Sequence, residues 1–543
     1  MYKLEKFKVK MHACIVVKNK SKVDIEDFQE TLQSLKSQGF ETCNVKEYPN
    51  VEADVWLFNG EKITKPLKNC NSIVQFNEVF REEERGRSSY LISSSKNTPI
   101  PKFVLSLADN EMNATKKFLI DYPKCLESHY KYAMLCMQNH DYKTAFEHFE
   151  TGRKWLNKPL KSEGWVNSWH QYSFDFESSI CAYYAQEHDK GQWYTDRVIV
   201  NKNVPQSLLS RTYQNYEFFI KSLQVLWTKE YFVQDMEEIP SILEGYKSLN
   251  PSLIPHPDGT FYLNLRIVNW SVNPVGFNQY TSSHPKNKFK TKNILGIINE
   301  EGNYVQKPQL VSKILPFTGK VRSHRIDGFE DCRLFASSQD EDTLHFITNC
   351  TKNNPKGDMR LSVGTIALSK DSSPKYTSLI PITGYGDNIT QKNWLLYNKE
   401  GTKAQAIYGY NPFTIIEIDL ETGIATPISQ AHFPIRSGEF RGSAGPVPFE
   451  DGYLLVIHQV YYKTHGGRRY LHRFIKLDST FLPTKISMAW YLQSDNIEYV
   501  STMQALSSGK ILIGYGLCDK CACITCVETK TISEMLRPIT DYL

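Results

Sequence analysis

Hydrophobic and polar positions alternate in short runs through residues 236–543. The segments Phe261-Tyr-Leu-Asn-Leu-Arg-Ile-Val268 and Tyr453-Leu-Leu-Val-Ile-His458 show this pattern, and turn sequences such as Pro257-Asp-Gly259 and Glu421-Thr-Gly423 lie between such runs. A period of two residues is typical of β-strands, and these turn residues favour antiparallel connections. Five four-stranded blades of about 60 residues would use this length. A five-bladed propeller with a central funnel is therefore predicted for residues 236–543.

A helical period replaces the alternation in residues 116–235, where Pro and Gly become rare. Within 129–149, the small residues Ala133 and Ala145 lie where two antiparallel helices would approach each other, and 139–141 breaks the pair. This unit resembles a tetratricopeptide-type hairpin, and two or three irregular repeats are expected. A generic helical bundle is the alternative. In both cases a helical segment joins two other modules and offers a surface for a protein partner.

Residues 1–115 mix strand-length apolar runs with one helical stretch, 25–38. The runs are 12–17, 54–58, 72–76 and 102–107. A small α/β domain is predicted. Its role is unknown, because it has neither a Gly-rich phosphate loop nor an Asp-x-Asp pair.

Composition and charge fit a folded protein with no charged polymer as its partner. The 543 residues are 41% hydrophobic and 23% charged, and 64 Lys and Arg stand against 59 Asp and Glu. The net charge of +5 is too small to indicate nucleic acid or an anionic membrane as a partner, and neither is expected.

The apolar run 13–17 is too short for a signal-peptide core. A soluble cytoplasmic protein is expected, and its 12 irregularly spaced cysteines are expected to be reduced thiols.

The segment Cys518-Asp-Lys-Cys-Ala-Cys-Ile-Thr-Cys526 contains two Cys-x-x-Cys pairs separated by one residue. Binding one tetrahedral zinc with all four would need tight turns where a strand is predicted. No metal and no cofactor are therefore expected.

Five polar clusters recur at blade-sized intervals in the β-region. They are Asn250-Pro-Ser252 with Asn264-Leu-Arg266, Gly328-Phe-Glu-Asp-Cys-Arg333, Lys392-Asn-Trp394, Arg441-Gly-Ser-Ala-Gly-Pro446 leading to His458, and Gly514-Tyr-Gly-Leu-Cys-Asp519. A funnel lined by one contribution from each blade would produce such a series.

The series resembles glycoside hydrolase family 130, five-bladed propeller enzymes that cleave or form β-mannosidic bonds, many of them by phosphorolysis. The resemblance covers about residues 245–540. Helical repeats followed by such a propeller also resemble uncharacterised glycan-processing proteins of bacteria and giant viruses. An oligosaccharide or glycan is the substrate that the resemblance implies.

The resemblance places the catalytic acid at Asp331, which would protonate the leaving oxygen through a hydroxyl of the bound sugar. Such an acid needs a raised pKa, which burial beside Glu330 would favour and Arg333 would oppose. The family's proline is Cys332 here. An ion cluster that ties blades together is the structural alternative. The implied sugar-binding residues are Asn250, Ser252, Arg266, Glu330, Arg333, Asn393, Arg441 and Asp519.

The nucleophile site departs from the family. Phosphorylases of this type hold phosphate with two arginines and a histidine. His458 matches the histidine, but the arginine positions hold Lys392 and Asn411. Phosphorolysis with inorganic phosphate as co-substrate, hydrolysis, and transfer from an activated sugar donor therefore remain open, each with inversion. A non-catalytic glycan-binding or scaffold protein and a glycosyltransferase are the alternative functions.

Overall fold

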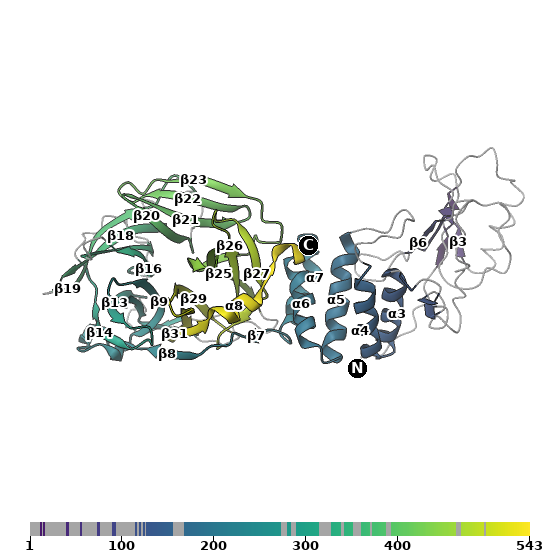
Figure 1. Cartoon of the computed structure of the whole chain (residues 1–543), viewed down its shortest axis with the longest axis horizontal. Helices are drawn as coiled ribbons and strands as arrows, with labels where there is room; N and C mark the ends of the chain where they lie inside the picture. The colour runs from purple at the N-terminus through teal and green to yellow at the C-terminus, as the bar shows by residue number, and fades with distance from the viewer. Residues whose placement is uncertain are drawn as a thin grey trace, which may run out of the picture. The chain divides into compact units, whose positions relative to one another are not determined.

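The structure is a computed structural model. It describes residues 115–542 except 117–118, 121–122, 125, 156–167, 273–279, 284–288, 314–326, 338–341, 351–359, 370–371, 387–391, 463–467 and 494–495, together with the backbone of six short strands before residue 115. Two compact units divide the chain, Met1–Glu187 and His188–Leu543 (Figure 1). No helix among the described residues is long and apolar enough to cross a membrane.

The six short strands of the first unit form two small sheets. They are β1 (Met11–Ala13), β2 (Ile15–Val16), β3 (Phe40–Thr42), β4 (Val55–Trp56), β5 (Ile73–Phe76) and β6 (Tyr90–Ser93). Strand β1 pairs with β3, and the other sheet has the order β2-β4-β5-β6. The rest of the predicted α/β domain, including its helix 25–38 and the run 102–107, lies outside the described residues.

The helices bounded within the described part of the first unit are α3 (Leu126–Gln138), α4 (Tyr142–Arg153) and α5 (Ser168–Tyr184). Helix α4 begins after Asp141, whose side chain accepts a hydrogen bond from the amide of Thr144 at 3.2 Å. Ala133 and Ala145 are both fully buried, as close packing of α3 on α4 requires. The predicted helices are present, and their assignment to the tetratricopeptide type stays a prediction.

The second unit begins with α6 (His188–Val200) and α7 (Gln206–Tyr216) and continues with five sheets in a propeller-like arrangement (Figure 1). The first sheet contains β9 (Lys247–Pro255), β10 (Phe261–Val268), β13 (Thr291–Ile298) and β14 (Tyr304–Leu310). The second contains β15 (Ser312–Lys313), β16 (Glu330–Ser337), β17 (Thr343–Cys350), β18 (Arg360–Ser369) and β19 (Ser372–Pro381). The third contains β20 (Leu395–Glu400), β21 (Lys403–Tyr410), β22 (Phe413–Asp419) and β23 (Ala425–Ala431).

The fourth sheet is the largest. It contains β24 (Arg441–Phe449), β25 (Gly452–Tyr462), β26 (Arg468–Leu477), β27 (Pro483–Ser487), β32 (Leu536–Pro538), β28 (Trp490–Tyr491) and β7 (Lys221–Ser222). The fifth contains β29 (Glu498–Ala505), β30 (Lys510–Leu517), β31 (Cys521–Glu528) and β8 (Trp227–Tyr231). The remaining elements are the hairpin of β11 (Trp270–Val272) and β12 (Tyr280–Ser282), η2 (Val233–Asp235), η3 (Ser241–Leu243), α8 (Thr529–Met535) and η4 (Ile539–Tyr542).

The five sheets close a ring through their first long strands. Strand β9 contacts β16, β16 contacts β20, β20 contacts β24, β24 contacts β29, and β29 returns to β9. Strand β8, which precedes the first sheet in sequence, is the outer strand of the fifth sheet and pairs with β31. The beginning and the end of the ring therefore share one sheet.

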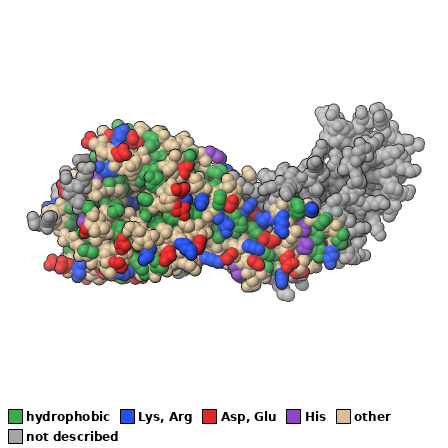
Figure 2. All heavy atoms as spheres, in the orientation of Figure 1, with side chains coloured by type: hydrophobic (Ala, Val, Ile, Leu, Met, Phe, Trp, Pro, Cys, Tyr) green, Lys and Arg blue, Asp and Glu red, His purple; other side chains and the backbone are tan. Residues whose placement is uncertain are grey.

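Hydrophobic clusters fill the spaces between neighbouring sheets. Leu454 and Phe474 of the fourth sheet pack with Ile513 of the fifth, and Leu263 of the first packs with Ile524 of the fifth. Every residue of β10 is buried, because both faces of this strand are covered; its polar residues Asn264 and Arg266 are therefore buried as well. Acidic and basic side chains are interspersed over the face of the molecule in view in Figure 2.

Candidate functional site

Four of the inner strands carry a β-bulge near the centre of the ring. In β9, residues 250 and 251 lie opposite the single residue 265, and in β16, residues 331 and 332 lie opposite 348. Single extra residues occur at Ser443 in β24 and Ser501 in β29. A bulge turns a side chain away from its regular direction in the sheet and is a common feature beside active sites.

Several predicted site residues have a left-handed backbone. The φ angles are +41° at Asn250, +50° at Asp331, +67° at Asn393 and +49° at Asp519. Residues other than glycine rarely take this conformation, and its strain concentrates at functional sites. The fold therefore stabilises strained positions at four of the residues that the sequence selects.

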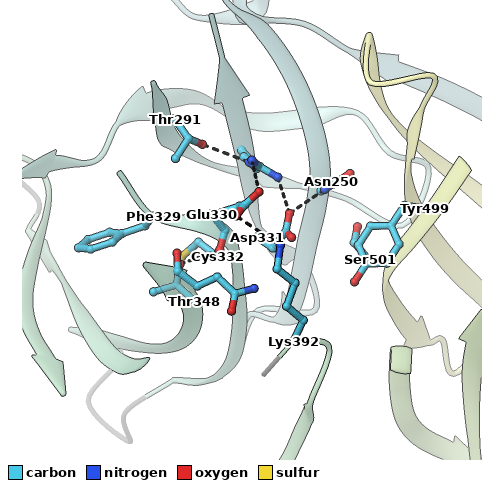
Figure 3. Close-up of polar contacts among 12 residues, drawn as sticks. Asn250, Thr291, Phe329, Glu330, Asp331, Cys332, Thr348, Lys392, Tyr499 and Ser501 are labelled. Carbon is cyan, nitrogen blue, oxygen red and sulfur yellow. Dashed lines mark hydrogen bonds and ion pairs between the residues drawn. The ribbon is translucent and has the colours of Figure 1, made fainter. Parts of the chain in front are cut away.

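The carboxylate of Asp331 is the centre of the polar contacts (Figure 3). Its Oδ1 accepts hydrogen bonds from Nη1 of Arg266 at 2.6 Å and from Nδ2 of Asn250 at 2.8 Å. Arg266 is 4% exposed and donates through Nη2 to Glu330 at 3.1 Å and through Nε to Thr291 at 3.1 Å. One guanidinium thus holds two adjacent carboxylates in place.

These contacts determine the charge of Asp331. Burial alone would raise the pKa of its carboxyl, but Arg266, Lys392, the Asn250 amide and Arg333 together outweigh burial and lower it. Asp331 is therefore an ionised carboxylate in the free site. The raised pKa expected from the sequence is not found, because Arg266, which is remote in sequence, forms the direct ion pair.

Glu330 and Lys392 form the next layer around Asp331. Nζ of Lys392 lies 3.7 Å from Oε2 of Glu330, and the Lys392 side chain is 42% exposed. The backbone carbonyl of Glu330 accepts a hydrogen bond from the Thr348 hydroxyl at 2.8 Å. Lys392 is therefore a solvent-accessible cation next to the carboxylates of Glu330 and Asp331.

Ser252 and Arg333 join inner strands. The Ser252 hydroxyl accepts a hydrogen bond from the amide of Leu334 at 2.8 Å, which connects β9 to β16. Arg333 donates through Nη1 to the carbonyl of Ser443 at 2.9 Å, and its guanidinium lies 5.4 Å from the centre of the Tyr499 ring. These two contacts hold β16, the strand that carries Asp331, against β9 and β24.

Asn393 and Arg441 are brought together by a glycine. A Cβ atom on Gly442 would lie 2.3 Å from the Asn393 carbonyl oxygen, so only glycine permits this approach. The Asn393 side chain accepts a hydrogen bond from the Tyr499 hydroxyl at 2.9 Å. Arg441 is exposed and precedes Gly442 in β24, and its positive charge acts on His458 and Tyr470.

His458 is buried and neutral. It is 2% exposed, its Nδ1 lies 2.8 Å from the Ser443 hydroxyl, and its ring stacks on Tyr470 with centroids 5.6 Å apart. Burial, with His472 and two arginines nearby, holds its pKa well below the usual range. His458 therefore offers a hydrogen bond and not a positive charge.

Asn411 lies between β21 and β22 and is exposed. Among the described residues its side chain makes no hydrogen bond to the Asp331 group. The preceding Tyr410 is 4% exposed, and burial raises the pKa of its hydroxyl while the nearby positive charge of Arg333 opposes this rise. The tyrosine, not the asparagine, belongs to the centre of the site.

Asp519 lies in the turn between β30 and β31 and faces the same charges. Burial, reinforced by Asp331 and Glu330, raises the pKa of its carboxyl to about 6 although Arg266 and Arg468 oppose the change. Arg266 and Asn250 thus contact Asp331 directly, and the charges of Arg266 and Asp331 act on Asp519.

Two residues of this region lie in none of the polar clusters found in the sequence: Thr291 and Tyr499. Tyr499 contacts Arg333 of the second sheet, Asn393 just before the third sheet and His458 of the fourth. No local pattern around Tyr499 marks it, because its role depends on closure of the ring.

The arrangement suits sugar recognition and proton transfer. Hydroxyl groups need both donors and acceptors, which the amides, carboxylates and guanidinium of this site provide. An ionised carboxylate within hydrogen-bond reach of a substrate hydroxyl can act as a general base, although its ion pair with Arg266 lowers its basicity.

No protein-family model matches the sequence, and no significant match occurs among curated proteins. Solved structures with similarity to the chain include a β-1,2-mannobiose phosphorylase from Listeria innocua in complex with β-1,2-mannobiose, with 14% identity and a TM-score of 0.37 over 57% of this chain and 98% of that one. A mannose phosphorylase from Leishmania mexicana in complex with phosphate has 10% identity and a TM-score of 0.36 over 61% and 96%. A GDP-mannose-dependent mannosyltransferase from Leishmania mexicana has 13% identity and a TM-score of 0.37 over 59% and 93%.

Proposed function

We propose that the protein is an inverting carbohydrate-active enzyme that exchanges a β-linked mannosyl or related hexosyl group between an acceptor hydroxyl and phosphate, with Asp331 moving the proton. The convergence of Asn250, Arg266 and Glu330 on Asp331 carries this proposal. The choice of mannose rests on the family resemblance. A glycan is the substrate in every version of the proposal.

The ionised state of Asp331 favours the bond-forming direction. The acceptor hydroxyl gives its proton to Asp331 while its oxygen forms a bond to the anomeric carbon. The bond from that carbon to the phosphate oxygen breaks on the opposite face, and its electron pair leaves with the phosphate. Cleavage is the reverse, in which protonated Asp331 returns the proton to the leaving oxygen and phosphate attacks.

Lys392 and Arg441 are the proposed phosphate ligands. Both side chains are exposed, and the close contact of Gly442 with Asn393 brings their segments together. Charge-assisted donors are what a phosphate dianion needs. Arg441 thus supplies the second cation that Asn411 lacks, and neutral His458 contributes at most a hydrogen bond.

Transfer from a nucleotide-activated donor is the second candidate. It needs Asp331 only in its ionised form, and the lowered pKa keeps the carboxyl ionised at neutral pH. The leaving diphosphate would occupy the same two cations. Hydrolysis and non-catalytic glycan binding are outcomes that the same experiment distinguishes.

The test is product analysis by NMR with the purified full-length protein. One set of reactions contains α-mannose 1-phosphate or GDP-mannose with mannose as acceptor, and the other contains β-1,2- or β-1,4-mannobiose with and without phosphate. Disaccharide formed from mannose 1-phosphate, and mannose 1-phosphate formed from mannobiose only when phosphate is present, would support the proposal. Product from GDP-mannose alone would establish the transferase. Free mannose with or without phosphate would establish a hydrolase.

Asp331→Asn tests the assignment of the proton carrier. Turnover should fall by about 10²- to 10⁴-fold, because the amide cannot accept the proton, while sugar binding measured by calorimetry persists. Asp451→Asn is the matched control, since Asp451 is 84% exposed at the opposite end of β24 from Arg441. Unchanged turnover in Asp331→Asn would contradict the proposal. Binding without turnover in the wild type would identify a glycan-binding protein.

A further inference from the structure

Three potential metal ligands lie together where the ring closes, outside the sugar site. The sulfurs of Cys521 and Cys523 are 3.7 Å apart, and a carboxylate oxygen of Glu230 lies within 4.8 Å of both. Cys521 and Cys523 belong to β31, and Glu230 belongs to β8. We propose that Cys521, Cys523 and Glu230 bind a zinc-class divalent metal ion that fastens β8 to β31.

Strand register supports the cluster. Glu230 is the direct cross-strand partner of Cys523, so their side chains are on one face of the sheet. Cys521 is two residues from Cys523 and shares that face. The three ligands are therefore set by the pairing of two strands and not by a flexible loop.

The sulfur separation fits a metal better than a disulfide. Two thiolates on a tetrahedral zinc, each about 2.3 Å from the metal, lie about 3.8 Å apart. A disulfide needs about 2.0 Å, and both cysteines are free thiols. Each thiol loses its proton to solvent when it binds the metal.

Tyr515 gives an independent indication. Its side chain is fully buried, it is the cross-strand partner of Cys523 in β30, and its hydroxyl lies beside Cys523 and Thr228 without a well-aligned hydrogen bond to either. A thiolate at Cys523 would accept this hydroxyl's hydrogen bond, as outer groups do around metal-bound ligands. Glu230 is exposed, which leaves a fourth position for water.

This site differs from the four-cysteine zinc site that the sequence of residues 518–526 argues against. Four cysteines on one zinc would have required tight turns, whereas here two cysteines of one strand act with a glutamate that is far away in sequence. The other cysteine of this strand, Cys526, belongs to a different hydrophobic cluster from Cys521 and Cys523.

Zinc content and cobalt spectra of the full-length protein test the site. Protein dialysed against chelator and reloaded should bind about one zinc per chain and show a thiolate-to-cobalt charge-transfer band in the near ultraviolet when Co²⁺ replaces zinc. The double variant C521S/C523S should lose both signals, and Tyr515→Phe should weaken binding about tenfold. Cys526→Ser is the control and should keep both signals.

Stability gives a second readout. Chelation should lower the urea midpoint of the wild type and leave that of Glu230→Gln much less affected. Glu230→Gln changes an exposed residue, so it should fold even if the double cysteine variant does not. Wild-type protein without zinc and without the cobalt band, a band that persists in C521S/C523S, or a mass lower by two hydrogens that locates a disulfide at this pair would overturn the proposal.

Discussion

Asp331 owes its chemistry to a bulge, a left-handed backbone and a buried arginine. The bulge in β16 turns its side chain toward Asn250 and Arg266, and the arginine keeps the carboxylate ionised. The sequence predicted that these three residues meet. It pointed to Arg333 as the opposing charge, because the effect of a bulge on side-chain direction is not visible in a motif.

The pH dependence of the two reaction directions should differ. The charges around Asp331 come from Arg266, Glu330, Arg333, Lys392 and Asp519. With its pKa lowered, Asp331 is ionised from about pH 5 upward, so its contribution to synthesis should be constant above that pH. The protonated form needed for cleavage should fall about tenfold for each pH unit, and kcat/KM for cleavage should fall with it.

Initial rates between about pH 7 and 8.5 in both directions measure this difference, because Asp519, whose pKa is raised to about 6, is then ionised throughout. Asp451→Asn should reproduce both wild-type profiles. A cleavage rate that rises with pH would contradict the assignment of Asp331 as its acid.

Gly442→Ala should damage the site without unfolding the protein. The new Cβ would meet the Asn393 carbonyl oxygen at 2.3 Å and push away the segment that carries Lys392. Displacement by about 1 Å can reduce turnover about 10²-fold. Steady-state kinetics should show this loss, while Gly409→Ala, whose nearest atom is 3.9 Å away, should match the wild type.

At the scale of elements, the alternation in the sequence predicts single strands well. The segment 261–268 is β10, and 453–458 lies within β25. The segment of β8 was predicted to lie in the helical stretch 116–235. Its five residues are too few to show a strand period, and they form a strand by pairing with β31. Tyr499 was missed for the same reason, since its partners come from other sheets.

Helix α6 is attached to β26 by a buried ion pair. Arg473 donates to both carboxylate oxygens of Asp196 at 2.5 and 2.7 Å, and neither side chain is exposed. Tyr216 of α7 donates to the same carboxylate. The first helices of the second unit thus belong to the same folded body as the fourth sheet.

Arg473→Met should lower the free energy of unfolding by about 3–5 kcal/mol, because it leaves the Asp196 charge buried without its partner. Asp196→Leu combined with Arg473→Met should recover part of this loss. Urea unfolding measures both free energies.

The control is Lys403→Met, which breaks the exposed ion pair with Glu417 and should lower the free energy of unfolding by less than about 1 kcal/mol. Equal losses in Arg473→Met and Lys403→Met would show that the buried pair has no special role.

At the scale of the molecule, the compact unit that contains the site begins at His188. The propeller was predicted to begin at residue 236, after β8 and after the two helices that hold the fourth sheet. The spacing of hydrophobic residues and the composition locate the change from helices to strands along the chain. They do not reveal which helices pack on which strands.

A chain of residues 188–543 should therefore unfold cooperatively in urea and keep the activity of the full protein. A chain of residues 236–543 should not, because it lacks β8, α6 and α7. Circular dichroism and the NMR assay compare the two chains. A stable, active 236–543 fragment would show that ring closure by β8 is dispensable.

Closure by β8 also determines when folding can finish during synthesis. The hydroxyl of Thr525 donates to the carbonyl of Trp227, 298 positions earlier. At 5–20 residues per second a ribosome needs roughly 15 to 60 seconds to make the intervening chain. Throughout that interval the nascent β8 has an open edge and no sheet to join. The strand that completes the ring is thus among the first strands of the second unit to be made, and it can be placed only after β31 has been made.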